Sequence, residues 1–142
     1  MFTWHDVTEV FLLSKEEWEK AVSTVENVPI ETDCRWWLRS QGSVTQNTAY
    51  VSKDGEINAT GTHVDTRVIC VRPAFRIPHL VPNNYKSGEK VLIGKTKCTM
   101  IAFDTVLADE VICFKRFDHA DNNYYTSEIK EYINSNAFRE LL

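Results

Sequence analysis

The sequence predicts an α+β fold in which mixed or antiparallel sheets combine with two main helices. Helix signals lie near both ends of the chain, while short runs of branched and aromatic residues between them are typical of strands. With 142 residues, of which 43% are hydrophobic, the chain is large enough to bury a core of its own. We therefore expect a single domain over residues 1–142.

The first elements are a short strand and a helix. "EVFLLS", residues 9–14, is an apolar run of strand length. Ser14 and Glu17 then form a capping box that opens the helix "SKEEWEKAVSTV". The helical spacing predicts one apolar face, made of Trp18, Ala21, Val22 and Val25.

A strand with two adjacent tryptophans comes next. "RWWLRS", residues 35–40, reads as a strand because aromatic and branched residues suit a pleated surface. Side chains of a strand alternate between its faces, so Trp36 and Leu38 are expected on one face and Trp37 and Arg39 on the other. One tryptophan is expected to be a buried anchor. Its neighbour should pack beneath the second half of the chain or line a recognition surface.

A hairpin and a long strand follow. "TAYVSKDGEINATG" has the form of a hairpin, because Asp54-Gly55 supplies the positive φ angles of a tight turn. "TRVICVRPAFRI", residues 66–77, reads as one long strand. Pro73 removes a ladder hydrogen bond and is therefore expected at an edge, a bulge or the end of the strand.

A segment rich in turn residues, 78–88, connects two pieces, residues 1–77 and 89–142. The second piece reads as strands with a turn near Ala108 and Asp109, followed by a helix that begins near Ser127. The apolar face of this helix consists of Ile129, Tyr132 and Ile133, and "NAFRELL" either extends it or forms a second short helix. This piece is too small to fold alone, so both pieces should share one core.

Charge and composition exclude several classes of protein. The net charge is -4, and the 16 basic residues are scattered without a phosphate-binding stripe, which disfavours direct nucleic-acid binding. No leader-like start and no run of about 18 apolar residues is present, so we expect a cytoplasmic protein without a membrane partner. Cys34, Cys70, Cys98 and Cys113 lack the paired spacing of a zinc site and are expected to be free thiols; those of Cys70 and Cys113 should be buried and inert.

Four stretches carry a resemblance to a known family. "VFLLSKEEWEKA", "WWLRS", "AYVSKDGEIN" and "VRPAF" resemble the carboxyl half of an uncharacterised bacterial and phage domain family that is distantly similar to C-type lectins and formylglycine-generating enzymes. "VLIGKTKCTMIAFD" and "YYTSEIKEYINSNAF" resemble the half that usually comes first. The resemblance implies a C-type-lectin-like fold in circularly permuted order, with residues 78–88 joining the original ends.

The resemblance also assigns roles to residues. Arg39 and Arg72 match the arginines of the two motifs and are expected to organise loops, since a guanidinium can stack on rings and donate five hydrogen bonds. Trp36 and Gly55 are expected to be structural as well. Gln41 stands where the family usually has proline. The residues expected to bind a ligand are Trp37, Gln41, Asn47, Tyr50, His63 and Asp65.

The most favoured function is therefore a non-enzymatic, phage- or mobile-element-associated module that binds another protein through the loops of a lectin-like fold. No nucleophile motif, phosphate loop or metal cluster supports catalysis, and no cofactor is expected. His119 between Asp118 and Asp121 could form a metal or acid-base site, but a polar surface loop explains it as well.

Two alternatives stay open. One is an intracellular anti-defence inhibitor, of the anti-CRISPR type, whose carboxylates would meet the basic channel of a nucleic-acid-binding effector. The other is calcium-dependent carbohydrate binding, for which Asn47, Asn58 and Asp65 have the appropriate oxygen ligands.

Overall fold

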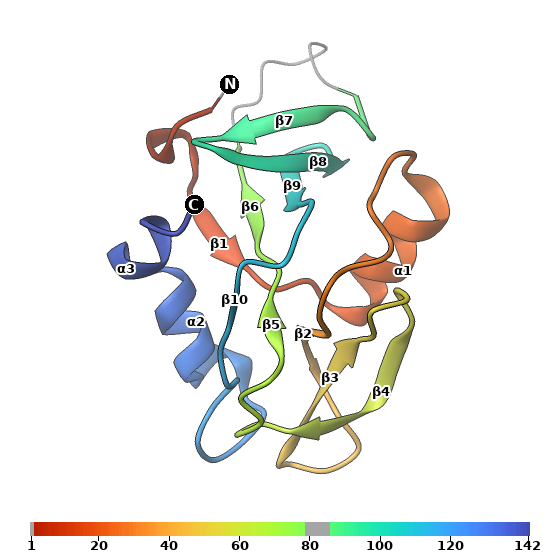
Figure 1. Ribbon diagram of the computed structural model, residues 1–142, viewed down its shortest axis with the longest axis vertical. Coiled ribbons are helices and arrows are strands. Elements are labelled where there is room, and N and C mark those ends of the chain that lie inside the picture. The colour runs from red at the N-terminus through yellow and green to blue at the C-terminus, as the bar shows by residue number, and fades with distance from the viewer. Residues whose placement is uncertain (1, 79–85) are drawn as a thin grey trace.

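A computed structural model describes residues 2–78 and 86–142, which form two five-stranded sheets and short helices (Figure 1). The expected α+β class with antiparallel and mixed sheets is confirmed. The first sheet has the strand order β1-β6-β9-β8-β7 and the second β10-β5-β2-β3-β4. Residues 79–85 of the expected connecting segment lie outside the described residues.

The strands of the first sheet are β1 (Glu9–Phe11), β6 (Ala74–Arg76), β7 (Lys90–Ile93), β8 (Thr96–Ala102) and β9 (Thr105–Ala108). Those of the second are β2 (Trp36–Gln41), β3 (Asn47–Val51), β4 (Ile57–His63), β5 (Cys70–Val71) and β10 (Cys113–Phe114). The helices are α1 (Lys15–Thr24), α2 (Glu128–Ile133) and α3 (Asn136–Arg139), with single 3-10 turns η1 (Trp4–Asp6) and η2 (Tyr124–Thr126).

Each sheet contains strands from both pieces of the chain. In the first sheet β6 lies between β1 and β9, and in the second β10 pairs with β5. Two apolar clusters, one containing Trp37 and the other Trp36, likewise draw residues from both pieces. The described parts of the two pieces are therefore packed into one body.

The capping box of α1 is confirmed. The Ser14 hydroxyl accepts a hydrogen bond from the Glu17 N–H at 3.1 Å, and the Glu17 carboxylate accepts one from the Ser14 N–H at 2.8 Å. Trp18 and Ala21 face the core as expected, but Val22 is 42% exposed. The expected apolar face was too wide at Val22, because a helix on the surface buries only one stripe.

The alternation along β2 is also confirmed. Trp36 and Leu38 enter one apolar cluster and Trp37 enters the other. Both tryptophans are fully buried, because both faces of β2 are covered at these positions. Trp18 of α1 packs edge-on against Trp36, with 4.9 Å between the ring centroids. Phe117 packs in the same way against Trp37, with 5.7 Å between the centroids.

The hairpin of β3 and β4 turns at Asp54-Gly55, as expected. Gly55 has φ 91°, and a Cβ there would lie 2.3 Å from Cγ2 of Ile30. Glycine is therefore required both by the backbone and by the space.

The expected long strand over residues 66–77 is wrong. Residues 66–69 are not in a strand, and Arg72 and Pro73 separate β5, which belongs to the second sheet, from β6, which belongs to the first. Pro73 does lie at the end of a strand, where its missing N–H breaks no ladder. The interruption lets one segment connect the two sheets.

In the second piece β9 ends at Ala108, near the expected turn, but a further turn at Phe103 and Asp104 separates β8 from β9. Ser127 caps α2, and residues 136–139 form the separate helix α3 instead of an extension. No helix among the described residues is long and apolar enough to cross a membrane.

Candidate functional site

Three loops meet at the lower end of the molecule in Figure 1, where the second sheet lies. We call the surface formed by residues 42–47, 63–67 and 116–128 the loop face. The Val64 N–H donates to the Gln46 carbonyl at 2.8 Å, and the Val64 carbonyl accepts from the N–H of Phe117 at 2.8 Å. The middle loop is thus bonded to both of its neighbours.

Asn122 completes this connection. Its side-chain amide donates to the carbonyls of Val44 and Asn47 at 3.1 and 2.9 Å, and its N–H donates to the carbonyl of Thr45 at 2.9 Å. Asn122 is only 6% exposed. Such buried, multiply bonded amides fix loop geometry, because losing one bond would leave a desolvated polar atom. The loop face is therefore held in one arrangement.

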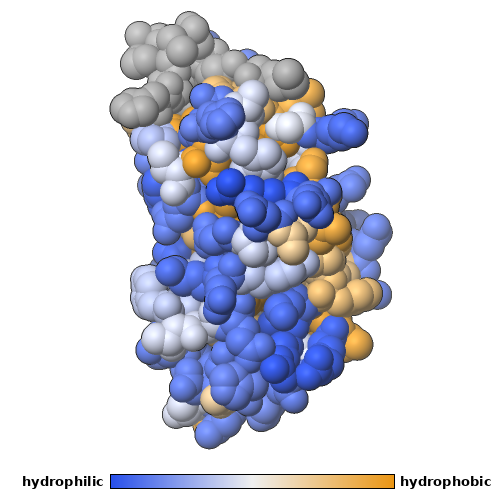
Figure 2. Space-filling model, turned by 90° about the vertical axis from the view of Figure 1, so that its left-hand side faces the viewer, coloured by the Kyte–Doolittle hydropathy of each residue, from blue (hydrophilic) through white to orange (hydrophobic). Residues whose placement is uncertain are grey.

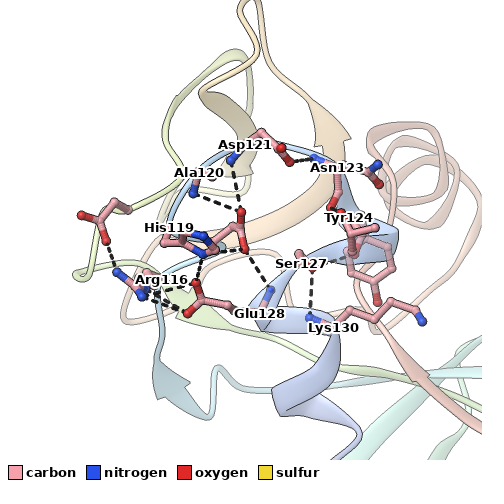
Figure 3. Close-up of polar contacts among 12 residues, drawn as sticks. Arg116, His119, Ala120, Asp121, Asn123, Tyr124, Ser127, Glu128 and Lys130 are labelled. Carbon is pink, nitrogen blue, oxygen red and sulfur yellow. Dashed lines mark hydrogen bonds and ion pairs between the residues drawn. The ribbon is translucent and has the colours of Figure 1, made fainter.

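A charged network covers the outer side of these loops (Figure 3). The Arg116 guanidinium donates to Asp65 at 2.8 Å and, through two nitrogens, to Glu128 at 3.0 and 3.1 Å. His119 Nδ1 lies 2.5 Å from the second oxygen of Glu128. Arg116 thereby ties the middle loop to the first turn of α2.

Asp118 organises the turn before α2. Its carboxylate accepts from the N–H groups of Ala120 and Asp121, both at 3.1 Å, and of Glu128 at 3.2 Å. Burial raises the pKa of this carboxyl, but the three hydrogen bonds outweigh burial and hold the pKa below its ordinary value. The side chain therefore stays ionised and ties the loop to the helix N-terminus.

The outer carboxylates are also stabilised as anions. The hydrogen bond from Arg116 lowers the pKa of Asp65. Burial raises the pKa of Glu128, but the hydrogen bonds with His119 and Arg116 more than compensate, so that its pKa is lowered. Both carboxylates are consequently ionised partners of a permanent cation.

Three of these side chains could in principle hold a metal ion. The ligand atoms of Asp118, His119 and Glu128 lie within 4.8 Å of one another. However, Arg116 donates to both oxygens of Glu128, and three N–H groups occupy Asp118. The arrangement is better suited to fixing loops than to coordinating a cation.

The structure brings three expected binding residues to the loop face. Asn47 lies opposite His63 across β3 and β4, and the His63 ring accepts a hydrogen bond from the Asp65 N–H at 3.1 Å. Gln41 ends β2 beside them and is exposed. Asn58, which the calcium alternative requires, is five residues before His63 along β4, so the three calcium ligands do not converge.

Tyr50 and Trp37 lie elsewhere. The Tyr50 hydroxyl accepts from the Asn58 amide at 3.0 Å, and its ring packs under Arg35, within the second sheet. Trp37 is 0% exposed and donates to the Lys115 carbonyl at 2.8 Å. The expectation that Trp37 contacts a ligand is therefore wrong, because its ring is enclosed by core residues.

The two motif arginines hold loops and strands together. Arg39 donates to the Leu12 carbonyl at 2.6 Å and pairs with Glu17. Arg72 is fully buried between the rings of Trp18 and Trp36, and donates to the carbonyls of Ala108, Pro29 and Asp109. Burial lowers the pKa of Arg72 to about 10.

Two exposed residues of the loop face were not expected as binding residues. Val44 is 53% exposed and Tyr125 is 72% exposed. Tyr125 also borders a groove of about 470 Å³, lined by Tyr125, Thr126, Ser127, Lys130, Glu131 and Asn134. Only the polar run "FDHADNN" gave a sequence signal for this region, since an exposed aromatic residue looks like a core residue in a pattern of apolar positions.

The four cysteines are free thiols. Burial raises the pKa of Cys70 and Cys98, the latter to about 12, which makes both unreactive. Cys34 and Cys113 are half-buried, so Cys113 is more accessible than its apolar sequence context predicted.

Comparison with protein-family models matches residues 5–79 to a domain of unknown function (DUF6273). This match spans the capping box, "WWLRS", the hairpin and "VRPAF". No curated protein and no solved structure matches the chain at a significant level.

Proposed function

We propose that this chain, which belongs to the DUF6273 family, is a non-enzymatic module that binds another protein through its loop face. The observation that carries the proposal is the hydrogen-bonded connection of three loops that are distant in sequence. A surface fixed before binding loses little conformational entropy when a partner docks. Protein interfaces also favour the residue types found here, with tyrosine and arginine among charged and polar groups.

The proposed contact surface combines exposed apolar side chains with polar ones. Val44 and Tyr125 supply exposed apolar area, and Asn47, His63 and Asp65 supply hydrogen-bonding groups. Figure 2, which views the side of α2 and α3, has a mainly hydrophilic lower half. Recognition at this end would therefore depend on a few apolar anchors within polar surroundings.

The relation to C-type lectins and the circular permutation are part of this proposal. The two sheets and the loops at one end support it, and so does the position of the chain ends. The Gly94 N–H donates to the Phe2 carbonyl at 3.0 Å, and a Cβ at Gly94 would lie 3.9 Å from the Leu142 carbonyl oxygen, so the first and last described residues are near each other. A permuted chain requires such neighbouring ends. We also propose a phage or mobile-element origin and a place in the host cytoplasm.

The experiment is affinity capture from cell lysate by the immobilised protein, with mass spectrometry of the retained proteins at low and high salt. We expect the immobilised wild type to retain a protein. The Tyr125→Ala variant should no longer retain it, whereas the Phe103→Ala variant should. Phe103 is the matched control, because it is 74% exposed and lies between two strands of the other sheet. Equal capture by both variants would contradict recognition at the loop face.

Salt dependence separates this proposal from the inhibitor alternative. Contacts of apolar anchors should survive high salt, whereas an acidic inhibitor of a basic effector should release its partner, because salt screens exposed charges. Thermal unfolding with and without calcium tests the carbohydrate alternative, since a ligand of the folded state raises the melting temperature.

A further inference from the structure

A second exposed apolar surface lies at the edge of the second sheet, at strand β10. We call Cys34, Val68 and Phe114 the β10 patch. Phe114 is opposite Cys70, so it extends the side of the sheet on which Trp36 is buried. Val68 lies in the bend before β5 and is exposed. The Cys34 thiol lies 3.5 Å from the Val68 carbonyl.

This patch is left open by the rest of the fold. Helix α1 covers the neighbouring part of the same side through Trp18, whereas Phe114 and Val68 are 63% and 60% exposed. Among the described strands β10 pairs only with β5 and is thus an edge strand. Exposed edges with apolar side chains are where extended segments of other proteins add to a sheet.

An acidic groove adjoins the patch. It is lined by Glu31, Thr32, Asp33, Asp109, Glu110 and Val111 and has a volume of about 150 Å³. Asp33 precedes Cys34, and Val111 lies two residues before β10. Cys34 and Val111 both pack against the cluster that contains Trp36, so the groove and the patch border the same cluster. The volume is roughly five times that of a water molecule in the liquid, ~30 Å³, which suits a side-chain end and not a helix.

The charge of the groove indicates what it would accept. Asp109 pairs with Lys90 at 3.1 Å, but Glu31, Asp33 and Glu110 form no ion pair with any residue in 2–78 or 86–142. Carboxylates without a protein cation repel nucleic acid and attract lysine or arginine.

We infer that the β10 patch and the acidic groove together bind an extended segment of a partner protein in which an apolar side chain is next to lysine or arginine residues. The apolar side chain would cover Phe114 and Val68, while the cation would enter the groove between Asp33 and Glu110. This surface is distinct from the loop face, and the inference does not depend on the function proposed for that face.

The test uses a fluorescein-labelled peptide of alternating leucine and lysine, with anisotropy as the readout of binding to the whole protein. We expect saturable binding that weakens about tenfold, or 1.4 kcal/mol, both for Phe114→Ser and for the double variant Glu31→Gln with Asp33→Asn. Raising the salt from about 0.1 M to about 1 M should weaken it too, since the screening length falls from ~10 to ~3 Å.

Three controls make the result specific. Peptides with glutamate in place of lysine, or serine in place of leucine, should bind at least about tenfold more weakly. Tyr125→Ala should bind the leucine-lysine peptide like the wild type, which separates this site from the loop face. Amide NMR of the bound protein should show the largest shifts at residues 31–34 and 110–114. No saturable binding, binding unaffected by Phe114→Ser, or equal binding of the glutamate peptide would overturn the inference.

Discussion

At the scale of single residues, Trp36 and Trp37 show how one strand supports two cores. Each ring is 0% exposed, and each packs edge-on against an aromatic ring from a different element. The two side chains leave β2 on opposite faces, so neither can substitute for the other. Both are structural, and the loop face depends on them only through the position of the second sheet.

Replacing either tryptophan by alanine should therefore lower the free energy of unfolding by about 3–5 kcal/mol. Urea denaturation followed by circular dichroism measures this loss. Phe103→Ala is the control and should change stability by less than about 0.5 kcal/mol, because Phe103 is exposed. A loss below about 1 kcal/mol for Trp37→Ala would refute its place in the core.

Asp118 makes the free energy of unfolding depend on pH in the acid range. Its folded-state pKa is lower than that of an unfolded aspartate, ~3.9, so its contribution is present above that pH. The contribution is lost as the pH falls through the folded-state pKa. Asp118→Asn should cost about 1–3 kcal/mol at neutral pH and flatten the decline of stability below about pH 4.

Urea unfolding at several values between neutral and acid pH measures this effect. Ser127→Ala is the control, because Ser127 caps the same helix without titrating. The Ser127→Ala variant should have a free energy of unfolding about 1 kcal/mol lower than the wild type, with the same pH dependence. A wild-type pH slope in Asp118→Asn would show that this carboxylate does not fix the turn.

The sequence could predict some of these residues and not others. Alternation placed Trp36 and Trp37 on opposite faces, but full burial of both depends on Trp18 and Phe117, which are distant in sequence. The Arg116 network joins Asp65 to Glu128 across 51 and 12 residues, and no local pattern encodes such a pairing.

At the scale of elements, a comparison of two glycines tests how tightly the turn between β3 and β4 is packed. Gly55 and Gly94 both have positive φ, at 91° and 60°, but differ in the space around them. A Cβ at Gly94 meets nothing closer than 3.9 Å, whereas at Gly55 it meets Ile30 at 2.3 Å. Gly94→Ala should thus cost only the backbone term, about 1–2 kcal/mol.

Gly55→Ala should cost clearly more than Gly94→Ala, because Ile30 must also move. Thermal and urea unfolding of the two variants, side by side, measures the difference. Equal costs would mean that the contact between the turn and Ile30 is absent in solution.

Elements with strong local signals were predicted correctly. The capping box at Ser14 and the Asp54-Gly55 turn each depend on residues within one turn. The turn between β8 and β9 was missed, because "AFDT" contains no glycine, proline or asparagine. The switch of sheets at Pro73 was missed as well, since Pro73 predicts an interruption but not where the chain goes next.

At the scale of the whole molecule, the α+β class followed from composition and pattern. The arrangement of two sheets did not, because the order β1-β6-β9-β8-β7 joins strands that are far apart in sequence. For the same reason the loop face was predicted only in part, through Asn47, His63 and Asp65. Its third loop comes from the other end of the chain.

The proposed permutation predicts that the chain can be reconnected. Joining residue 142 to residue 2 through a short flexible linker, with new ends between residues 82 and 83, should preserve the fold, because the first and last described residues lie near each other. The free energy of unfolding should stay within roughly 1–2 kcal/mol of the original, the scale of changes in loop closure. A reconnected chain without a cooperative unfolding transition would contradict the proposed permutation.

The most direct test of protein recognition by the loop face is hydrogen exchange of the complex with the captured partner. We predict that binding slows exchange in residues 42–47, 63–67 and 116–128 and leaves the turn between β8 and β9 unchanged. Protection confined to the first sheet, with the loop face exchanging as in the free protein, would contradict recognition at the loop face.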